Sequence, residues 1–111
     1  VSPCPNDDRG IIDLPLSKSG TKDYQRMSVN QNMGKRAITE YKVLDKVGSR
    51  VALVALFPKT GRTHQLRVHL EYINAPIVGD NKYRGLSEFI CHLKIYQNIR
   101  NFLRLNGYQI I

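Results

Sequence analysis

The sequence has 111 residues, of which 41% are hydrophobic and 23% are charged, a composition typical of one soluble globular domain. Seventeen Lys and Arg residues against nine Asp and Glu give a formal net charge of +8. This excess favours an anionic partner, with nucleic acid the first candidate and an ordinary basic surface the alternative. No apolar run reaches the roughly 20 residues of a membrane span, and Cys4 and Cys91 are too few for a disulfide framework, so we expect a cytoplasmic protein without membrane contact.

The spacing of the histidines argues against a metal site, and the N-terminal residues argue against a signal peptide. His64 and His69 are five residues apart, which places them about 140° from each other on a helix. Helical zinc ligands are usually four residues apart, so we expect no metal. The first ten residues have no initiator Met and no basic segment followed by an apolar one. They predict no signal peptide, and a chain that was processed or that begins inside a longer product.

The first third of the chain is predicted to be largely irregular. Residues 1–10 are rich in Pro, Asn and Asp and indicate a loop. A short extended piece follows from Gly10 to Leu16 and is interrupted by Pro15. The segment from Ser17 to Lys35 is polar and keeps no hydrophobic period, so we predict a long loop, a feature that often serves function in a compact domain.

The middle of the chain predicts a β-hairpin. From Ala37 to Lys46 the side chains alternate between two faces, with Thr39, Tyr41 and Val43 on one and Glu40 and Lys42 on the other. This alternation is typical of a strand with one solvated face. After a turn, the segment from Val51 to Phe57 is almost wholly apolar, which indicates a strand buried on both faces.

A helix is predicted next, from Arg62 to Ile73. Its apolar side chains would form a narrow stripe of Leu66, Leu70 and Ile73. Either Thr60 or Thr63 could cap its first turn. Beyond this helix the apolar residues are scattered, and only a second, weaker helix is predicted near residues 99–105.

The densest group of basic side chains lies at the start of the predicted helix, in residues 59–69. Lys59, Arg62 and Arg67 stand where helix N–H groups already favour anions, and a planar guanidinium matches phosphate or carboxylate. This combination predicts an anion site. The alternative is a solvated helix face on which Arg67 pairs with Glu71, a contact worth about 0.3–0.5 kcal/mol. A nucleotide-binding loop is excluded because the GxxxxGK[ST] pattern is absent.

Two strings in this region resemble hallmarks of the Rlu-type RNA pseudouridine synthases. They are TGRTHQLRVHL at residues 60–70 and APIVGDNKY at residues 75–83. Upstream, GIIDLPL at residues 10–16 and AITEYKVL at residues 37–44 are similar to further segments of the family. The resemblance covers about residues 1–85, as the C-terminal half of the family's catalytic domain, and leaves residues 86–111 as a divergent tail.

The resemblance implies an α+β fold with a mixed, largely antiparallel sheet and a packed helix, as part of the pseudouridine synthase fold. The family isomerises uridine in RNA to pseudouridine: the N-glycosidic bond breaks, the uracil turns and a carbon–carbon bond forms, without cofactor or metal. The target uridine must leave its stacked position to enter a pocket. The implied partner is therefore RNA, with large-subunit ribosomal RNA ahead of transfer RNA.

The same resemblance assigns individual residues. Arg67 corresponds to the catalytic-site arginine that orients a nucleophilic aspartate and keeps it ionised. The residues expected to contact RNA are Lys59, Arg62, His64, Lys82 and Arg84.

The sequence departs from the family pattern in three respects. The nucleophile belongs to an Arg-Leu-Asp motif, and a family tyrosine near the target uracil also belongs upstream; no Arg-Leu-Asp occurs in the 111 residues. Arg84 interrupts the usual Lys-Tyr-Gly, and a later Leu-His-Ala strand is matched only by Ile90-Cys91-His92-Leu93. We therefore expect an enzyme fragment that is inactive alone and is either expressed whole elsewhere or completed by another chain, the missing N-terminal half. The alternatives are a catalytically dead RNA-binding remnant and a basic domain of unrelated function.

Overall fold

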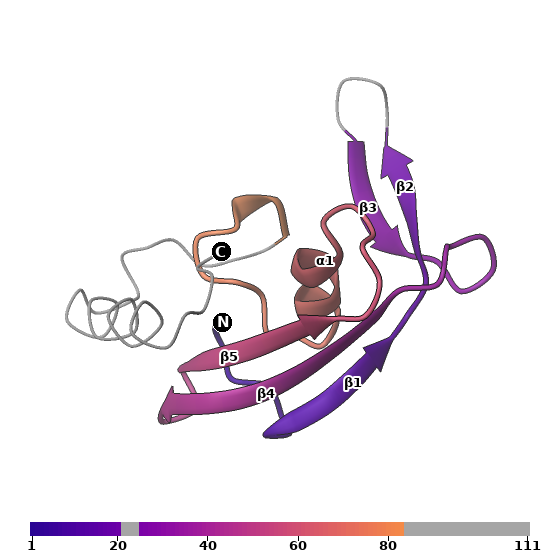
Figure 1. Ribbon diagram of the computed structural model, residues 1–111. Coiled ribbons are helices and arrows are strands. Elements are labelled where there is room, and N and C mark those ends of the chain that lie inside the picture. The colour runs from indigo at the N-terminus through magenta and orange to yellow at the C-terminus, as the bar shows by residue number, and fades with distance from the viewer. Residues whose placement is uncertain (21–24, 84–111) are drawn as a thin grey trace.

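The computed structural model describes residues 1–20 and 25–83, which form two antiparallel sheets with a short helix beside them (Figure 1). In chain order the elements are β1 (Arg9–Asp13), β2 (Leu16–Gly20), β3 (Gln25–Val29), β4 (Ile38–Val47), β5 (Val51–Pro58), α1 (Gln65–Tyr72) and the 3-10 turn η1 (Asn81–Tyr83). The expected α+β class with antiparallel pairing and a packed helix is confirmed. The tail at residues 86–111 and the helix predicted near residues 99–105 lie outside the described residues. Within the described ranges, no helix is long and apolar enough to cross a membrane.

The larger sheet has the strand order β1-β4-β5, and the predicted hairpin of β4 and β5 is confirmed. Thr39 and Tyr41 are buried on β4 while Glu40 and Lys42 are exposed, as the alternation predicted. Gly10 of β1 lies opposite Tyr41, and a Cβ at this glycine would stand 2.8 Å from the phenol ring. Only glycine therefore lets β1 approach the ring this closely.

The smaller sheet is a hairpin of β2 and β3, so the long loop predicted from Ser17 to Lys35 is wrong at residues 17–20 and 25–29. Each strand has only five residues, too few for a period of two to stand out among polar neighbours. The hairpin is held instead by tertiary contact with α1 (Figure 1). Its inward side chains enter the main apolar cluster, which comprises Leu16, Met27, Ala37, Val68 and Tyr83.

Helix α1 begins three residues later than predicted, at Gln65, and ends at Tyr72. His64 is its N-cap residue, with a φ of 53°, and no side chain caps the first turn. The predicted caps, Thr60 and Thr63, are therefore wrong. The Thr60 hydroxyl is already engaged in hydrogen bonds with the β4 backbone and with the Gln65 side chain.

The predicted apolar stripe of α1 is correct only in part. Leu70 is fully buried, whereas Leu66 and Ile73 are partly exposed. Two polar side chains, Gln65 and His69, share the buried face instead. They tolerate burial because both are hydrogen-bonded there, which the hydrophobic pattern could not indicate.

Candidate functional site

The buried face of α1 carries a directed chain of hydrogen bonds. His69 Nε2 lies 2.9 Å from the carbonyl oxygen of Leu14, which can only accept, so this nitrogen carries the hydrogen. His69 Nδ1 lies 2.8 Å from Thr39 Oγ1 and therefore accepts the hydroxyl hydrogen. Thr39 Oγ1 in turn accepts from Gln65 Nε2 at 2.9 Å. The chain ties α1 to β4 and to the segment between β1 and β2.

Gln65 also fixes the turn that precedes the helix. Its Oε1 accepts from the Thr60 hydroxyl at 2.6 Å and from the Arg62 backbone N–H at 3.0 Å, and its Nε2 donates to the Ile38 carbonyl at 2.9 Å. The predicted first helical turn is thus a separate turn, shaped by this side chain together with one backbone hydrogen bond, from the Gln65 N–H to the Arg62 carbonyl at 3.1 Å. Burial lowers the pKa of His69 and so favours its neutral form. The buried face of α1 thus carries two uncharged polar side chains, Gln65 and His69.

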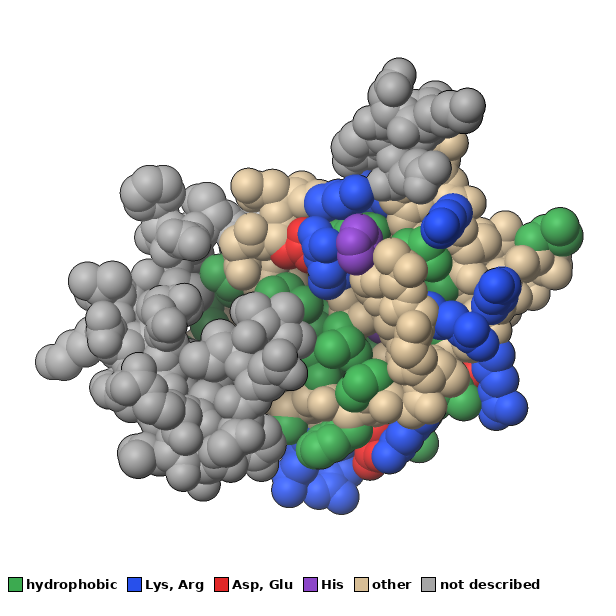
Figure 2. Space-filling model, turned by 45° about the horizontal axis from the view of Figure 1, so that its top comes forward, with side chains coloured by type: hydrophobic (Ala, Val, Ile, Leu, Met, Phe, Trp, Pro, Cys, Tyr) green, Lys and Arg blue, Asp and Glu red, His purple; other side chains and the backbone are tan. Residues whose placement is uncertain are grey.

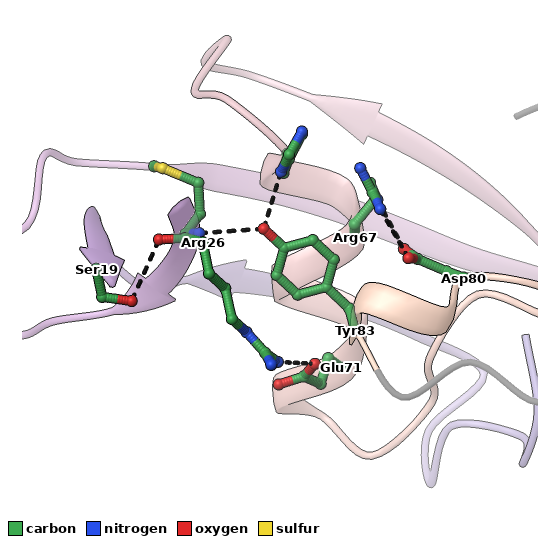
Figure 3. A network of polar contacts seen from close by, with 8 residues as sticks. Ser19, Arg26, Arg67, Glu71, Asp80 and Tyr83 are labelled. Carbon is green, nitrogen blue, oxygen red and sulfur yellow. Dashed lines mark hydrogen bonds and ion pairs between the residues drawn. The ribbon is translucent and has the colours of Figure 1, made fainter. Parts of the chain in front are cut away.

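On the other side of α1, Arg67 pairs with Asp80 in the segment after the helix (Figure 3). Arg67 Nε and Nη2 each donate to one carboxylate oxygen at 2.7 Å, a two-pronged contact. The Asp80 side chain is only 7% exposed. The hydrogen bond between them lowers the pKa of Asp80 and raises that of Arg67. The alternative pairing of Arg67 with Glu71 is therefore wrong, because Asp80 presents both oxygens from a nearly buried position.

Tyr83, which is fully buried, lies between two arginines (Figure 3). The guanidinium carbons of Arg26 and Arg67 are each 4.8 Å from the centroid of its ring, within the range of cation–π attraction. Arg26 comes from β3 and pairs at 2.5 Å with Glu71 of α1. The tyrosine ring thus joins β3, α1 and η1 at one point, and each arginine has its own carboxylate.

His64 meets the edge of the same ring. The two ring centroids are 5.6 Å apart, and His64 Nδ1 lies 2.8 Å from the Tyr83 hydroxyl oxygen. That hydroxyl already accepts the Met27 N–H at 3.1 Å, so its own hydrogen is available to Nδ1. Burial, followed by the charges of Arg67 and Lys82, lowers the pKa of His64 and favours the neutral ring with its hydrogen on Nε2.

The backbone of His64 lies in the left-handed region, which is uncommon for a residue other than glycine. Backbone strain of this kind costs on the order of 1–3 kcal/mol and gathers at functional sites. Here the strained residue stands between the glycine turn and α1, and it directs its ring toward Tyr83. The strain therefore supports a functional role for this end of the helix.

An open hollow of about 280 Å³ lies beside Arg67. It is lined by Arg67, Ile77, Val78, Gly79, Asp80, Asn81 and Lys82. Figure 2 shows Lys and Arg side chains gathered near a histidine and an acidic side chain on one face of the molecule. Two of the predicted site residues, Arg67 and Lys82, line this hollow, and the positive charges of both lower the pKa of His64.

Two other predicted site residues, Lys59 and Arg62, make contacts with β4 and with the segment before it. The exposed Lys59 Nζ lies 3.5 Å from a carboxylate oxygen of Glu40 on β4. Arg62, also exposed, donates from Nε to the Arg36 carbonyl at 2.8 Å. Arg84 lies outside the described residues. An RNA-binding role for these three stays a prediction.

Sequence reasoning missed Arg26 and the roles of Asp80 and Tyr83. Asp80 and Tyr83 belong to the string at residues 75–83, so a signal existed, although it did not reveal what they contact. Arg26 gave none, because its segment was predicted as a loop. Its place in the site follows only from the hairpin of β2 and β3.

The arrangement suits anion binding and offers no prepared nucleophile. Both carboxylates of the site, Asp80 and Glu71, are paired with arginines. In the part of the chain that the structure describes, no three His, Cys, Asp or Glu side chains group so as to hold a metal ion. A cluster of arginines with this geometry can orient an acidic group and stabilise its charge.

Comparison with known proteins gives a consistent set of relatives. A family model described as RNA pseudouridylate synthase matches residues 1–72. The ribosomal large subunit pseudouridine synthase D of Borreliella burgdorferi is 54% identical over 59 residues, which are 53% of this chain and 18% of that protein. The synthase D of Blochmanniella floridana is 41% identical over 96 residues, 85% of this chain and 28% of that protein. The chain thus spans less than a third of the length of these relatives.

Solved structures agree with the sequence comparison. The structure of human RNA pseudouridylate synthase domain containing 1 matches with a TM-score of 0.60 and 29% identity, covering 84% of this chain and 38% of that one. Human RNA pseudouridylate synthase domain containing 4 matches with a TM-score of 0.59 and 27% identity, covering 97% and 43%. The partial fold that the sequence predicted is confirmed by both.

Proposed function

The chain belongs to the RNA pseudouridylate synthase family, and we propose that its residues 1–83 form part of a catalytic site that isomerises uridine to pseudouridine in RNA. The observation that carries this proposal is Arg67, held at 2.7 Å by both oxygens of Asp80 beside an open hollow. The proposed substrate is ribosomal RNA of the large subunit, because the similar synthases C and D carry that substrate in their names.

In the proposed reaction a carboxylate attacks C1′ of the sugar as the bond between C1′ and N1 of the uracil breaks. The freed uracil turns, its C5 bonds to C1′ and displaces the carboxylate, and the C5 proton is released to solvent. Arg67 would orient this carboxylate and keep it ionised through hydrogen bonds to its charged form. No Arg-Leu-Asp occurs in the 111 residues, so the nucleophile would come from a part of a synthase that this chain does not contain. The missing N-terminal half of the domain is therefore the proposed protein partner.

The proposed RNA contacts begin at the group formed by His64, Arg67 and Lys82. A neutral His64 would donate a hydrogen bond from Nε2, and Lys82 would act as a point charge on phosphate. Lys59, Arg62 and Arg84 are proposed as further contacts along the strand. The net charge of +8 supports a polyanionic partner.

The test is a chimera that restores the missing half. In the Blochmanniella synthase D, the segment that matches this chain is replaced by the chain's own residues, and tritium release from 5-tritiated uridine in RNA is measured. We expect the chimera to be active. Arg67→Ala should lower kcat on the order of 100-fold, as misplaced catalytic groups do. Arg67→Lys should also lower it, because a point charge cannot reproduce a two-pronged contact.

A matched control is Lys42→Gln, which changes an exposed basic residue on β4 away from the site. It should leave kcat unchanged. Normal activity with Arg67→Ala would contradict the role given to Arg67. An unaltered chimera that binds RNA without releasing tritium would contradict the catalytic proposal and favour the alternative, RNA binding without catalysis.

A further inference from the structure

The pair with Asp80 occupies only one edge of the Arg67 guanidinium. An arginine has five N–H donors, and Asp80 takes the one on Nε and one on Nη2. The edge formed by Nη1 and the second N–H of Nη2 is left over. Among the described residues no acceptor is hydrogen-bonded to Nη1, and in Figure 3 one terminal nitrogen of Arg67 points away from Asp80.

The open edge is held in a fixed direction. Asp80 is nearly buried, and after Arg67 the backbone N–H groups of Tyr83 and Lys82 also lower the pKa of its carboxyl. The ring of Tyr83 stacks on the guanidinium at 4.8 Å, and the Tyr83 hydroxyl is itself fixed by the Met27 N–H. The Arg67 guanidinium is thus held in its own plane by Asp80 and on one face by the Tyr83 ring, before a second carboxylate binds.

The open edge is also within reach of a partner. The Arg67 side chain is 31% exposed, against 7% for Asp80, and it lines the hollow. The charges around it are three positive, on Arg26, Arg67 and Lys82, and two negative, on Glu71 and Asp80. Their sum of +1 matches one monovalent anion, and two parallel N–H groups match the two oxygens of a carboxylate.

We propose that Asp80 and Tyr83 are positioning residues, which aim the open edge of Arg67 at a second carboxylate so that one guanidinium bridges two acids. This proposal rests on the proposed function, in which that second carboxylate is the nucleophile. Asp80 thereby acts on the reaction through Arg67 and does not touch the substrate. The alternative is that Asp80 only neutralises the charge of Arg67. In that case, removing the Asp80 carboxylate would free Arg67 to bind other anions.

The first experiment uses the 111-residue chain itself. The hydrogen exchange of the Arg67 Nε–H is followed by ¹⁵N NMR in the unaltered chain and in Asp80→Asn. We expect a slowly exchanging signal that is lost in Asp80→Asn. The matched control is Glu71→Gln, which removes the carboxylate partner of Arg26 and should leave the Arg67 signal in place. A signal that survives Asp80→Asn would overturn the proposal.

The second experiment measures kcat and KM in the active chimera. Asp80→Asn should lower kcat at least about tenfold and leave KM for RNA nearly unchanged, because positioning acts on the transition state. Asp80→Glu should recover part of kcat. Tyr83→Phe keeps the stacking ring and should retain most of kcat, whereas Tyr83→Leu should lose it.

The two proposals fail in different ways. An unaltered chimera without activity would sink the proposed function, and this inference with it. An active chimera in which Asp80→Asn keeps its full kcat would overturn the inference alone. A rise in kcat with Asp80→Asn would mean that Asp80 competes with the nucleophile, which is the reverse of positioning.

Discussion

Thr39 and His69 share a hydrogen bond of 2.8 Å in the interior, and its direction is fixed because the other nitrogen of His69 donates to the Leu14 carbonyl. A second hydrogen on the imidazole would point at the Thr39 hydroxyl, which then could no longer donate to it. Burial adds the cost of placing a charge among apolar groups. The folded chain therefore disfavours the protonated form of His69.

The first prediction is a loss of stability toward acid. The pKa values of His69 and His64 are lowered from the ordinary 6.5, so below that pH the unfolded chain takes up protons that the folded chain does not. The free energy of unfolding should fall as pH drops through about 6.5, by at most about 1.4 kcal/mol per pH unit for each histidine. Urea unfolding at about pH 7.5 and about pH 5.5 measures this.

The contribution of each histidine can be separated by substitution. His64→Gln should keep the share of His69, while His69→Gln should remove it, at some cost in stability at neutral pH. Equal unfolding free energies at both pH values in the unaltered chain would contradict the buried neutral state of His69.

The second prediction concerns Gln65, whose side chain holds the turn before α1. Gln65→Leu keeps the volume and removes four hydrogen bonds. It should lower the free energy of unfolding by about 1–3 kcal/mol for each buried partner left unsatisfied. Circular dichroism in urea measures the change, with Lys42→Gln as an exposed control expected within about 0.5 kcal/mol. An unchanged midpoint for Gln65→Leu would refute the structural role of this residue.

The third prediction is that RNA binding depends on salt. For single strands the log–log slope should be about −0.7 per phosphate neutralised. Because Lys82 lies with Arg67 and His64, Lys82→Gln should make the slope shallower by about 0.7, whereas Lys59→Gln should change it less. Filter binding with single-stranded RNA measures both. A slope near zero would show that the chain neutralises no phosphates of the RNA.

The fourth prediction is that the 111-residue chain alone is inactive. Both carboxylates at the site are paired with arginines, and the sequence contains no Arg-Leu-Asp. No tritium should be released from 5-tritiated uridine in RNA, with the active chimera as the positive control. Turnover above background would mean that another carboxylate of this chain serves as the nucleophile.

The long strands were predictable from sequence, and the short ones were not. β4 and β5 have ten and eight residues, enough for alternation and for an apolar run to stand out. β2 and β3 have five each, and the hairpin depends on Leu16 and Met27 meeting side chains that are remote in sequence. Such a hairpin is specified by tertiary packing, which a local pattern does not contain.

At the site, sequence reasoning found Arg67 and missed its partner. The nearest carboxylate along the helix is Glu71, yet the carboxylate that binds Arg67 is 13 residues away, because the segment between α1 and η1 brings Asp80 back to the helix. Glu71 is bound by Arg26 across a separation of 45 residues. An i,i+4 rule compares neighbours on one helix and cannot foresee an acid that arrives from another element.

Two sets of positions on α1 and its N-cap have different roles. Residues 65 and 68–70 are buried in the core, whereas His64 and Arg67 contact Tyr83 and the residue at 71 pairs with Arg26. Inserting one residue inside α1, beside Leu66, would rotate the part of the helix that follows by about 100° relative to Gln65. Arg67 and His69 would turn away from Asp80 and Thr39 while Gln65 kept its partners. Such an insertion should therefore destabilise the fold far more than one in the exposed turn at residues 61–63, because loops absorb added residues.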